Sequence, residues 1–401
     1  MIAWMLAAAL AAPCEALTNV VVHLADGPVA DAHVAWSDGV ITSVGAGPAP
    51  AGCTATAAPG RQVTAGLVSV GLQLGLVEIE LEPSTRDDAW DHDPVRAALQ
   101  VAWAYNPRSA VVPVSRMGGL TSALVTPTGG LVSGQAAWVA TAASTQADAV
   151  VKPSAAVVVH LDGLDSRAAA WTRLRELIQD ARHAAASGAL RSWQGLDQHG
   201  ASRLDLEVLA RVARKELPLL VHADRAADLE AAIAFAAEQA VDVVVLGAAE
   251  GWLVAERLAA AGVGVLVEPL VHGAGSMDQL HGRPDNAARL HAAGVQVGLV
   301  HVDTMNARAL RFVAGNAVRE GLPHAAALEG ITRVPARLLG LEDRGDLAVG
   351  QRADLALWTG DPLEIASRLE GLWAGGAPVS LRSRQTDLLD AWRTVPRTLT
   401  P

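Results

Sequence analysis

Short runs of apolar, mostly β-branched residues alternate with alanine- and leucine-rich stretches of helical periodicity over most of the chain. Apolar runs without alternating polar residues are typical of strands that are covered on both faces. Strand and helix repeated at this length predict an α/β fold with a (β/α)8 TIM-like barrel, and a doubly wound open sheet is the alternative. The expected strands are Ala110–Val114, Ser122–Thr126, Ala156–His160, Leu217–His222, Val241–Leu246, Val263–Val267 and Val295–Val302. The expected helices are Arg167–Ala186, Asp205–Lys215, Ala226–Gln239, Leu253–Ala261, Pro284–Ala293 and Ala307–Glu320.

The composition excludes several classes of protein. Of 401 residues, 51% are hydrophobic and 18% are charged, which is not the composition of a disordered chain. The net charge of −11 is spread without a block of like charges, so we expect no nucleic-acid partner. No apolar run of transmembrane length occurs inside the chain, so we expect no membrane span.

The first residues, MIAWMLAAALAAPCEALTN, combine a short apolar core with small residues before Leu17. This pattern predicts an export signal over residues 1–16, cleaved near Ala16, and a periplasmic or extracellular protein. The basic start of such a signal is missing, so a buried first strand in a cytoplasmic protein is the alternative. Cys14 and Cys53 can pair only if Cys14 survives processing, and otherwise Cys53 is a lone thiol of the core.

Several segments follow one another in a recognisable order. Residues 61–76, RQVTAGLVSVGLQLGL, form an apolar strand that is entered through a turn at Ala65-Gly66. In their order along the chain, the segments resemble motifs of the amidohydrolase superfamily. Residues 120–135, LTSALVTPTGGLVSGQ, resemble its imidazolonepropionase-like branch. The remaining motifs are VITSVG at 40–45, PLLVHADR at 218–225, VGLVHVD at 297–303 and GDLAVGQRADLALW at 345–358.

The resemblance implies a division of the chain into two parts. Residues 66–339 are expected to form the TIM-like barrel. Residues 17–65 and 340–401 are expected to form a small β-sandwich built from both chain ends. In TIM barrels the chemistry lies at the carboxyl ends of the strands, so the site residues are sought there.

The first barrel strand of the superfamily carries two histidines that hold a catalytic divalent metal. Their matching positions here are Gly71 and Gln73, which leaves two ligands missing. His222 matches a metal-binding histidine of the fifth strand, and Asp303 matches the aspartate that binds metal and takes a proton from water. Asp303 equally suits the N-cap of the next helix, or the register slips by one residue and places Val302 there.

Other residues are expected near the same site. His160 ends the expected fourth strand and, with His301, is a candidate substitute metal ligand, although a lone histidine after an apolar run is more often satisfied locally. No lysine matches the position that bridges two metals in part of the superfamily, because Lys152 falls before the expected strand. The candidate substrate-binding residues are Gln73, Gln135, Glu250, Asn306 and Arg308.

Two functions stay open. By resemblance the chain is a hydrolase of non-peptide C–N bonds, with impaired or lost metal catalysis because ligand positions are missing. In that case zinc or another divalent metal is the cofactor and a small molecule is the substrate. The alternative is a non-catalytic binding or assembly module that needs no metal. The sequence leaves a homo-oligomer open.

Overall fold

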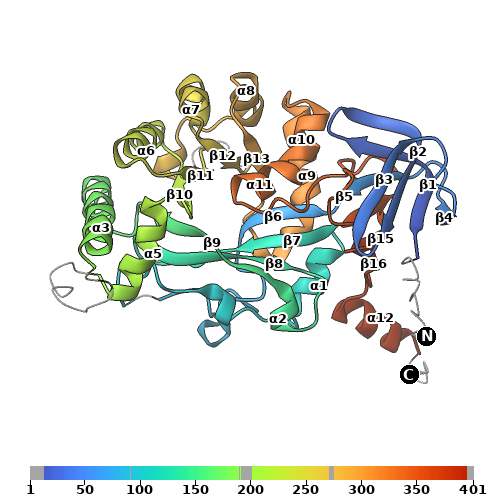
Figure 1. Ribbon diagram of the computed structural model, residues 1–401, viewed down its shortest axis with the longest axis horizontal. Helices are drawn as coiled ribbons and strands as arrows, with labels where there is room; N and C mark the ends of the chain where they lie inside the picture. The colour runs from blue at the N-terminus through green and yellow to red at the C-terminus, as the bar shows by residue number, and fades with distance from the viewer. Residues whose placement is uncertain (1–12, 91, 189, 191–200, 271–274, 395–401) are drawn as a thin grey trace, which may run out of the picture.

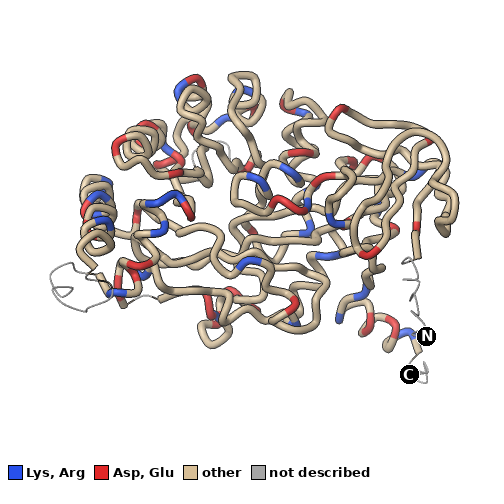
Figure 2. The backbone as a smooth tube through the Cα atoms, in the orientation of Figure 1, with Lys and Arg blue, Asp and Glu red and all other residues tan. Residues whose placement is uncertain are grey.

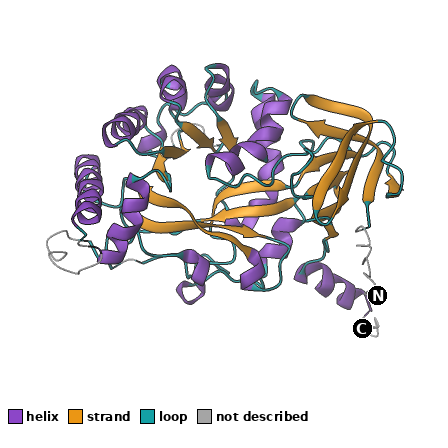
Figure 3. Ribbon diagram, in the orientation of Figure 1, coloured by secondary structure: helices purple, strands orange, loops and turns teal. Residues whose placement is uncertain are grey.

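The computed structural model describes residues 13–90, 92–188, 190, 201–270 and 275–394. It is a mixed α/β structure in which two eight-stranded sheets lie side by side, one at each end of the molecule (Figure 1). Figure 3 shows most of the helices on the outer side of the larger, curled sheet. None of the described helices is long and apolar enough to cross a membrane.

The first sheet joins the two ends of the chain. Its strand order is β16-β15-β14-β5-β1-β2-β3, and β4 pairs with β1. The seam between the early and late strands is the antiparallel pair of β5 and β14, in which Val63 lies opposite Leu357. The strands are β1 (Glu15–Leu24), β2 (Gly27–Ser37), β3 (Val40–Ala46), β4 (Thr54–Ala57), β5 (Gln62–Ala65), β14 (Leu355–Trp358), β15 (Leu369–Ala374) and β16 (Ala377–Pro378).

A disulfide between Cys14 and Cys53 ties the start of β1 to β4, with a Cα–Cα distance of 4.4 Å. Cys53 is therefore not a lone thiol, and it is half-buried rather than part of the core. Glu15 and Ala16 already lie in β1, where they pair with both β2 and β4. Cleavage near Ala16 would remove Cys14 and the disulfide with it. The rest of the expected export signal, residues 1–12, lies outside the described residues.

The second sheet follows the chain in order, β6 to β13, and curls so that β6–β9 face β10–β13 (Figure 1). Seven of its strands run in one direction. β8 runs antiparallel to both of its neighbours, so the sheet departs from eight identical strand-helix units. Its strands are β6 (Leu67–Leu72), β7 (Leu120–Val125), β8 (Val132–Ala140), β9 (Val150–His160), β10 (Leu219–Ala223), β11 (Val243–Gly247), β12 (Gly264–Val267) and β13 (Val297–Leu299).

Two details of this sheet correct the sequence-based expectation. The strand expected at residues 110–114 is wrong, because Val111–Arg116 form helix α1, with Pro113 in the first turn where a missing N–H is tolerated. The strand β8 was not expected. The chain reverses after β7 at Gly129 and Gly130, which have φ of +85° and +66°, and returns as β8.

The helices cover the outer side of the curled sheet. Ser202 and Asp205 form a capping box at the start of α5, which explains why this helix begins where it does. Figure 2 shows acidic and basic residues interleaved along α3, α6 and α7. The longer helices are α3 (Arg167–Ser187), α5 (Arg203–Ala213), α6 (Ala226–Gln239), α7 (Ala255–Ala261), α8 (Asn286–Ala292), α9 (Leu310–Arg319), α10 (His324–Gly330), α11 (Arg333–Leu338) and α12 (Arg384–Thr394).

The curled sheet has apolar residues on both faces. An inner cluster, which includes Val70, Trp138 and Leu246, fills the space enclosed by the strands. A larger outer cluster joins the sheet to the helices. Coverage on both faces explains the uninterrupted valine runs in the sequence, and it leaves the strand ends as the place where polar side chains can gather.

Candidate functional site

A cavity of about 400 Å³ lies at the carboxyl ends of the strands of the curled sheet. Residues at the ends of β6, β9, β10, β11 and β12 open into it, together with residues that follow β13 and the segment before α8. The lining residues are Gly71, Gln73, His160, Asp162, Arg167, His222, Ala223, Asp224, Leu246, Gly247, Glu268, Asp278, Gln279, Val300 and Val302. Three residues expected from the sequence, Gln73, His160 and His222, are therefore brought together here.

His160 and His222 are neighbours on adjacent parallel strands, and their rings stack with centroids 3.9 Å apart. The Nε2 atoms of both rings are buried and have no hydrogen-bond partner. A neutral imidazole has one ring nitrogen that donates a hydrogen bond and one that accepts. Each ring therefore keeps one buried nitrogen available to a partner.

Both imidazoles are held neutral. Burial lowers the pKa of His160 below its usual 6.5, although nearby Asp162 opposes the shift. The pKa of His222 lies well below the usual value, because the ring is removed from water and sits beside the second imidazole. The pair can accept hydrogen bonds or bind a cation at neutral pH without first losing protons.

We expect the free energy of unfolding to fall as the pH drops below about 6.5. The unfolded chain protonates these histidines in that range while the folded chain resists, so the unfolded state binds more protons. Each unit of pKa lowering corresponds to about 1.4 kcal/mol. Urea titrations near pH 7.5 and pH 5.5 measure the difference, and His222→Gln should reduce it. The matched control is His183→Gln on the exposed face of α3, and an equal reduction there would contradict the assignment.

The first-strand position is closed by apolar side chains. Gly71 has φ of +84°, and a Cβ built on it would lie 3.1 Å from Leu246 and 3.3 Å from Val302. Gln73 lines the cavity but is already engaged: its backbone N–H donates to Thr304 Oγ1 at 2.9 Å, and its side-chain amide donates to Thr126 Oγ1 at 3.3 Å. Neither position that matches a ligand histidine therefore supplies a free ligand: the amide of Gln73 is already hydrogen-bonded, and Gly71 lies against apolar side chains.

Asp303 caps the start of a helix, which was the alternative to a catalytic role in the sequence analysis. It is the N-cap of η6 (Thr304–Ala309), and its carboxylate accepts from both the backbone and the side-chain amide of Asn306. Val302, one residue earlier, lines the cavity instead. Asn306 and Arg308 are exposed and are not among the lining residues.

Two further candidates lie away from the cavity. Gln135 is on β8, where its backbone N–H donates to Leu99 and its side-chain amide to Ala98. Glu250 accepts from the backbone N–H of Ala226 at the start of α6 and from the backbone and ring of His281. Both contacts stabilise the architecture around the site.

The structure pairs His301, a candidate from the sequence, with Glu268, which the sequence analysis did not single out, and both side chains are largely buried. Glu268 directly follows β12, and its Oε1 lies 2.6 Å from His301 Nδ1. Its other oxygen accepts from the backbone N–H of Val302 at 3.1 Å. The Glu268 carboxylate raises the pKa of His301, and the two side chains are only 13% and 16% exposed. Inspecting the residue after the strand expected at 263–267 would have found Glu268 from the sequence.

These residues do not fit a catalytic metal of the usual kind. Such a site needs about three protein ligands and an open position for water. Within the described ranges, no group of three or more His, Cys, Asp or Glu side chains is placed to hold a metal ion. His160 and His222 offer two nitrogens, while Gly71 and Val302 offer no donor side chain. Lys152 lies within β9, near its start, and donates to Gly340, so it does not bridge metals either.

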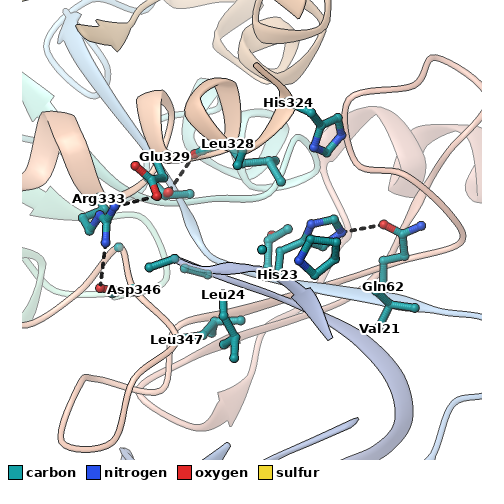
Figure 4. A pocket seen from close by; sticks show the side chains of 18 of the residues that line it. Val21, His23, Leu24, Gln62, His324, Leu328, Glu329, Arg333, Asp346 and Leu347 are labelled. Carbon is teal, nitrogen blue, oxygen red and sulfur yellow. Dashed lines mark hydrogen bonds and ion pairs between the residues drawn. The ribbon is translucent and has the colours of Figure 1, made fainter. Parts of the chain in front are cut away.

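A second cavity, of about 440 Å³, lies between β1, β5 and the helices α10 and α11. In Figure 4, His23 is bonded to Gln62 on one side, and Arg333 contacts Glu329 and Asp346 on the other. Although similar in size, it is far from the strand ends, where parallel barrels place their chemistry. We therefore take the first cavity as the candidate site.

Comparison with known proteins agrees with the fold. A crystal structure of an amidohydrolase from Thermotoga maritima superposes with a TM-score of 0.83 and 24% identity, covering 92% of this chain and 100% of that one. Molinate hydrolase superposes with a TM-score of 0.58 and 18% identity, over 98% and 99% of the two chains. At these identities the likeness establishes the fold alone.

Sequence comparison identifies the family. Imidazolonepropionase from Ruegeria pomeroyi is 59% identical over 44 residues, which are 11% of either chain. Amidohydrolase tasK from Hapsidospora irregularis is 34% identical over 113 residues, 26% of this chain and 12% of that one. The matches thus span only about a tenth of each curated relative. The family model described as "Amidohydrolase family" matches residues 117–381, more than half of the chain. The chain therefore belongs to the amidohydrolase family and resembles its imidazolonepropionase-like members.

Proposed function

We propose that the cavity at the strand ends binds a small organic molecule and that the chain lacks the metal-activated hydrolysis of its superfamily. The observation that carries this proposal is the replacement of ligand positions by an apolar wall. A Cβ at Gly71 would lie 3.1 Å from Leu246 and 3.3 Å from Val302, so a ligand side chain at this position would be crowded by apolar neighbours. A cavity of about 400 Å³ with a few polar groups is of the size that small-molecule sites have.

A hydrolase of non-peptide C–N bonds is the second candidate. The chain's family and the partnerless Nε2 atoms of His160 and His222 favour it, since two neutral imidazoles are good ligands for zinc. In that case a divalent metal would activate water, and the chain would need a third ligand. Gln73 would remain a contact for the substrate in either function.

Metal content and hydrolysis, measured together, separate the two functions. We expect well below one zinc ion per chain in the purified full-length protein after incubation with zinc and dialysis. We also expect no hydrolysis across a panel of cyclic amides and dipeptides. The double variant His160→Gln/His222→Gln should have the same zinc content as the unmodified protein. Near-stoichiometric zinc that is lost in this double variant but kept in His183→Gln, with metal-dependent turnover, would establish the hydrolase.

The chain divides into two structural parts. We propose that residues 66–339 are a derivative of the (β/α)8 TIM-like barrel and that the β-sandwich is built from the described residues up to 65, including all of β1, and from 340 onward. The curled order of β6 to β13 and the pairing of β5 with β14 support this division. The disulfide supports an oxidising compartment outside the cytoplasm, where such bonds persist.

A further inference from the structure

The candidate cavity is rich in carboxylates and poor in free cations. Among the described lining residues the one guanidinium, Arg167, is engaged by Asp228 and Asp278, with Nε 3.1 Å from Asp228. Glu268 is paired with His301, and Asp278 with Arg167 and Arg225, but no ion pair within the described residues engages Asp162 or Asp224, so the lining has an excess of negative charge. Its acidic side chains are Asp162, Asp224, Glu268 and Asp278.

Contacts with neighbouring residues hold the Asp224 side chain in the cavity wall. It follows β10, and its Oδ1 lies 2.5 Å from where a Cβ on Gly247 would stand, so only glycine allows this approach. Its carboxylate accepts from the side-chain amide of Gln279 at 2.8 Å and from the backbone N–H of Ala249 at 3.1 Å. Burial raises the pKa of Asp224, and the nearby carboxylates of Asp278 and Glu250 raise it further.

The remaining polar groups are imidazoles and amides. The Nε2 atoms of the stacked His160 and His222 rings are buried beside the cavity and have no hydrogen-bond partner. The amide donors of Gln73 and Gln279 are engaged by Thr126 and Asp224. A ligand that brings its own N–H donors and a positive charge would satisfy these groups, whereas an anion would meet like charge.

Part of the lining is apolar. Leu246, Val300 and Val302 line the cavity, and none of them carries a polar side-chain atom. Leu246 lies in register with His222 on the neighbouring strand, and the backbone N–H of Val302 donates to Glu268, so the apolar side chains lie among the polar groups. A ligand that fits this mixed lining carries a charged nitrogen on a short hydrocarbon body.

We propose that the cavity at the strand ends selects a small organic cation, an alkylammonium or amidinium with a short apolar body. The inference rests on the proposed function, since it places the cation in a cavity whose residues do not complete a metal site. Asp224 and Glu268, the latter shared with His301, provide the carboxylates, and the imidazole pair lies beside them.

The test is isothermal titration of EDTA-treated full-length protein with matched probes at neutral pH. Benzamidine, benzamide and benzoate share one ring, and hexylammonium, hexanol and hexanoate share one chain. We expect benzamidine and hexylammonium to bind at least about tenfold more tightly than the neutral and anionic partners. Equal binding of benzoate or benzamide, or no binding by any probe, overturns the inference.

Variants locate the binding site. Glu268→Gln and Asp224→Asn should each weaken hexylammonium by about tenfold, because each removes a charge from a partly dehydrated site. Glu329→Gln removes a carboxylate from the second cavity (Figure 4) and should leave the affinity unchanged. If Asp224→Asn fails to fold, as judged by circular dichroism, Glu268→Gln alone decides. Unchanged affinity in it, or a loss in Glu329→Gln, contradicts the assignment.

A parallel titration with zinc chloride distinguishes failure of the inference from failure of the proposed function. Stoichiometric zinc binding that displaces hexylammonium, together with hydrolysis, would refute the proposed function and the inference with it. Preference for neutral or anionic probes without zinc binding would refute the ligand class alone.

Discussion

Gly71→Ala should lower the free energy of unfolding by about 1–3 kcal/mol, and Gly71→His should lower it further. The backbone at this position has φ of +84°, which L residues with a side chain rarely adopt. The new Cβ would also press on Leu246 at 3.1 Å and Val302 at 3.3 Å, both of which belong to the closed wall of the cavity. Urea unfolding at neutral pH measures the loss.

A second glycine separates backbone strain from packing. Gly294 has φ of +87°, but nothing lies within 4 Å of a Cβ built there. Gly294→Ala therefore reports the backbone cost alone, and Gly71→Ala should exceed it. A smaller loss at Gly71 would show that the wall can move aside.

The same geometry bears on restoring a metal site. Gly71→His with Gln73→His supplies the imidazoles that the superfamily carries, yet the first of them would start from a strained backbone and a filled space. We expect no gain of stoichiometric zinc in this double variant. Stoichiometric zinc binding by the double variant would mean that the ligand histidines were replaced without any change in the packing around them.

Removing the disulfide should have an effect of similar size or larger. Cys14 and Cys53 close a loop with a sequence separation of 39 residues, for which loop-closure entropy gives about 4 kcal/mol, and measured values for native disulfides commonly lie at 2–4 kcal/mol. Cys14→Ser/Cys53→Ser should lower the free energy of unfolding by about that amount, because the unfolded chain gains freedom. Denaturant titration of the whole chain measures it.

The control is chemical reduction. Dithiothreitol should destabilise the native chain and leave the double serine variant unaffected. Equal stability of the native chain and the variant under oxidising conditions would contradict a structural role for the bond between β1 and β4.

The sequence predicted those site residues that stand at the carboxyl end of an expected strand. His160, His222 and Gln73 were expected near one site, and the structure brings all three to one cavity. Each follows an apolar run closely enough that the carboxyl end of the strand can be read directly. The mixed α/β architecture followed from the same valine runs.

Other features depend on long-range packing that residue patterns do not encode. Asp303 suits both a strand end and a helix cap, and only the neighbouring Asn306 and the register of β13 decide for the cap. The reversal that makes β8 antiparallel depends on two glycines with positive φ, whose conformation the sequence allows but does not require. The pairing of Glu268 with His301 joins segments 33 residues apart.

The seam between β5 and β14 joins residues almost three hundred positions apart, so Gln62 must wait for Trp358 to be synthesised. At ribosomal speeds of roughly 5–20 residues per second, that interval lasts on the order of 15–60 seconds. Throughout it, β5 presents an unpaired edge that another nascent chain could extend. A chaperone that shields this edge during translation would protect the chain from aggregation.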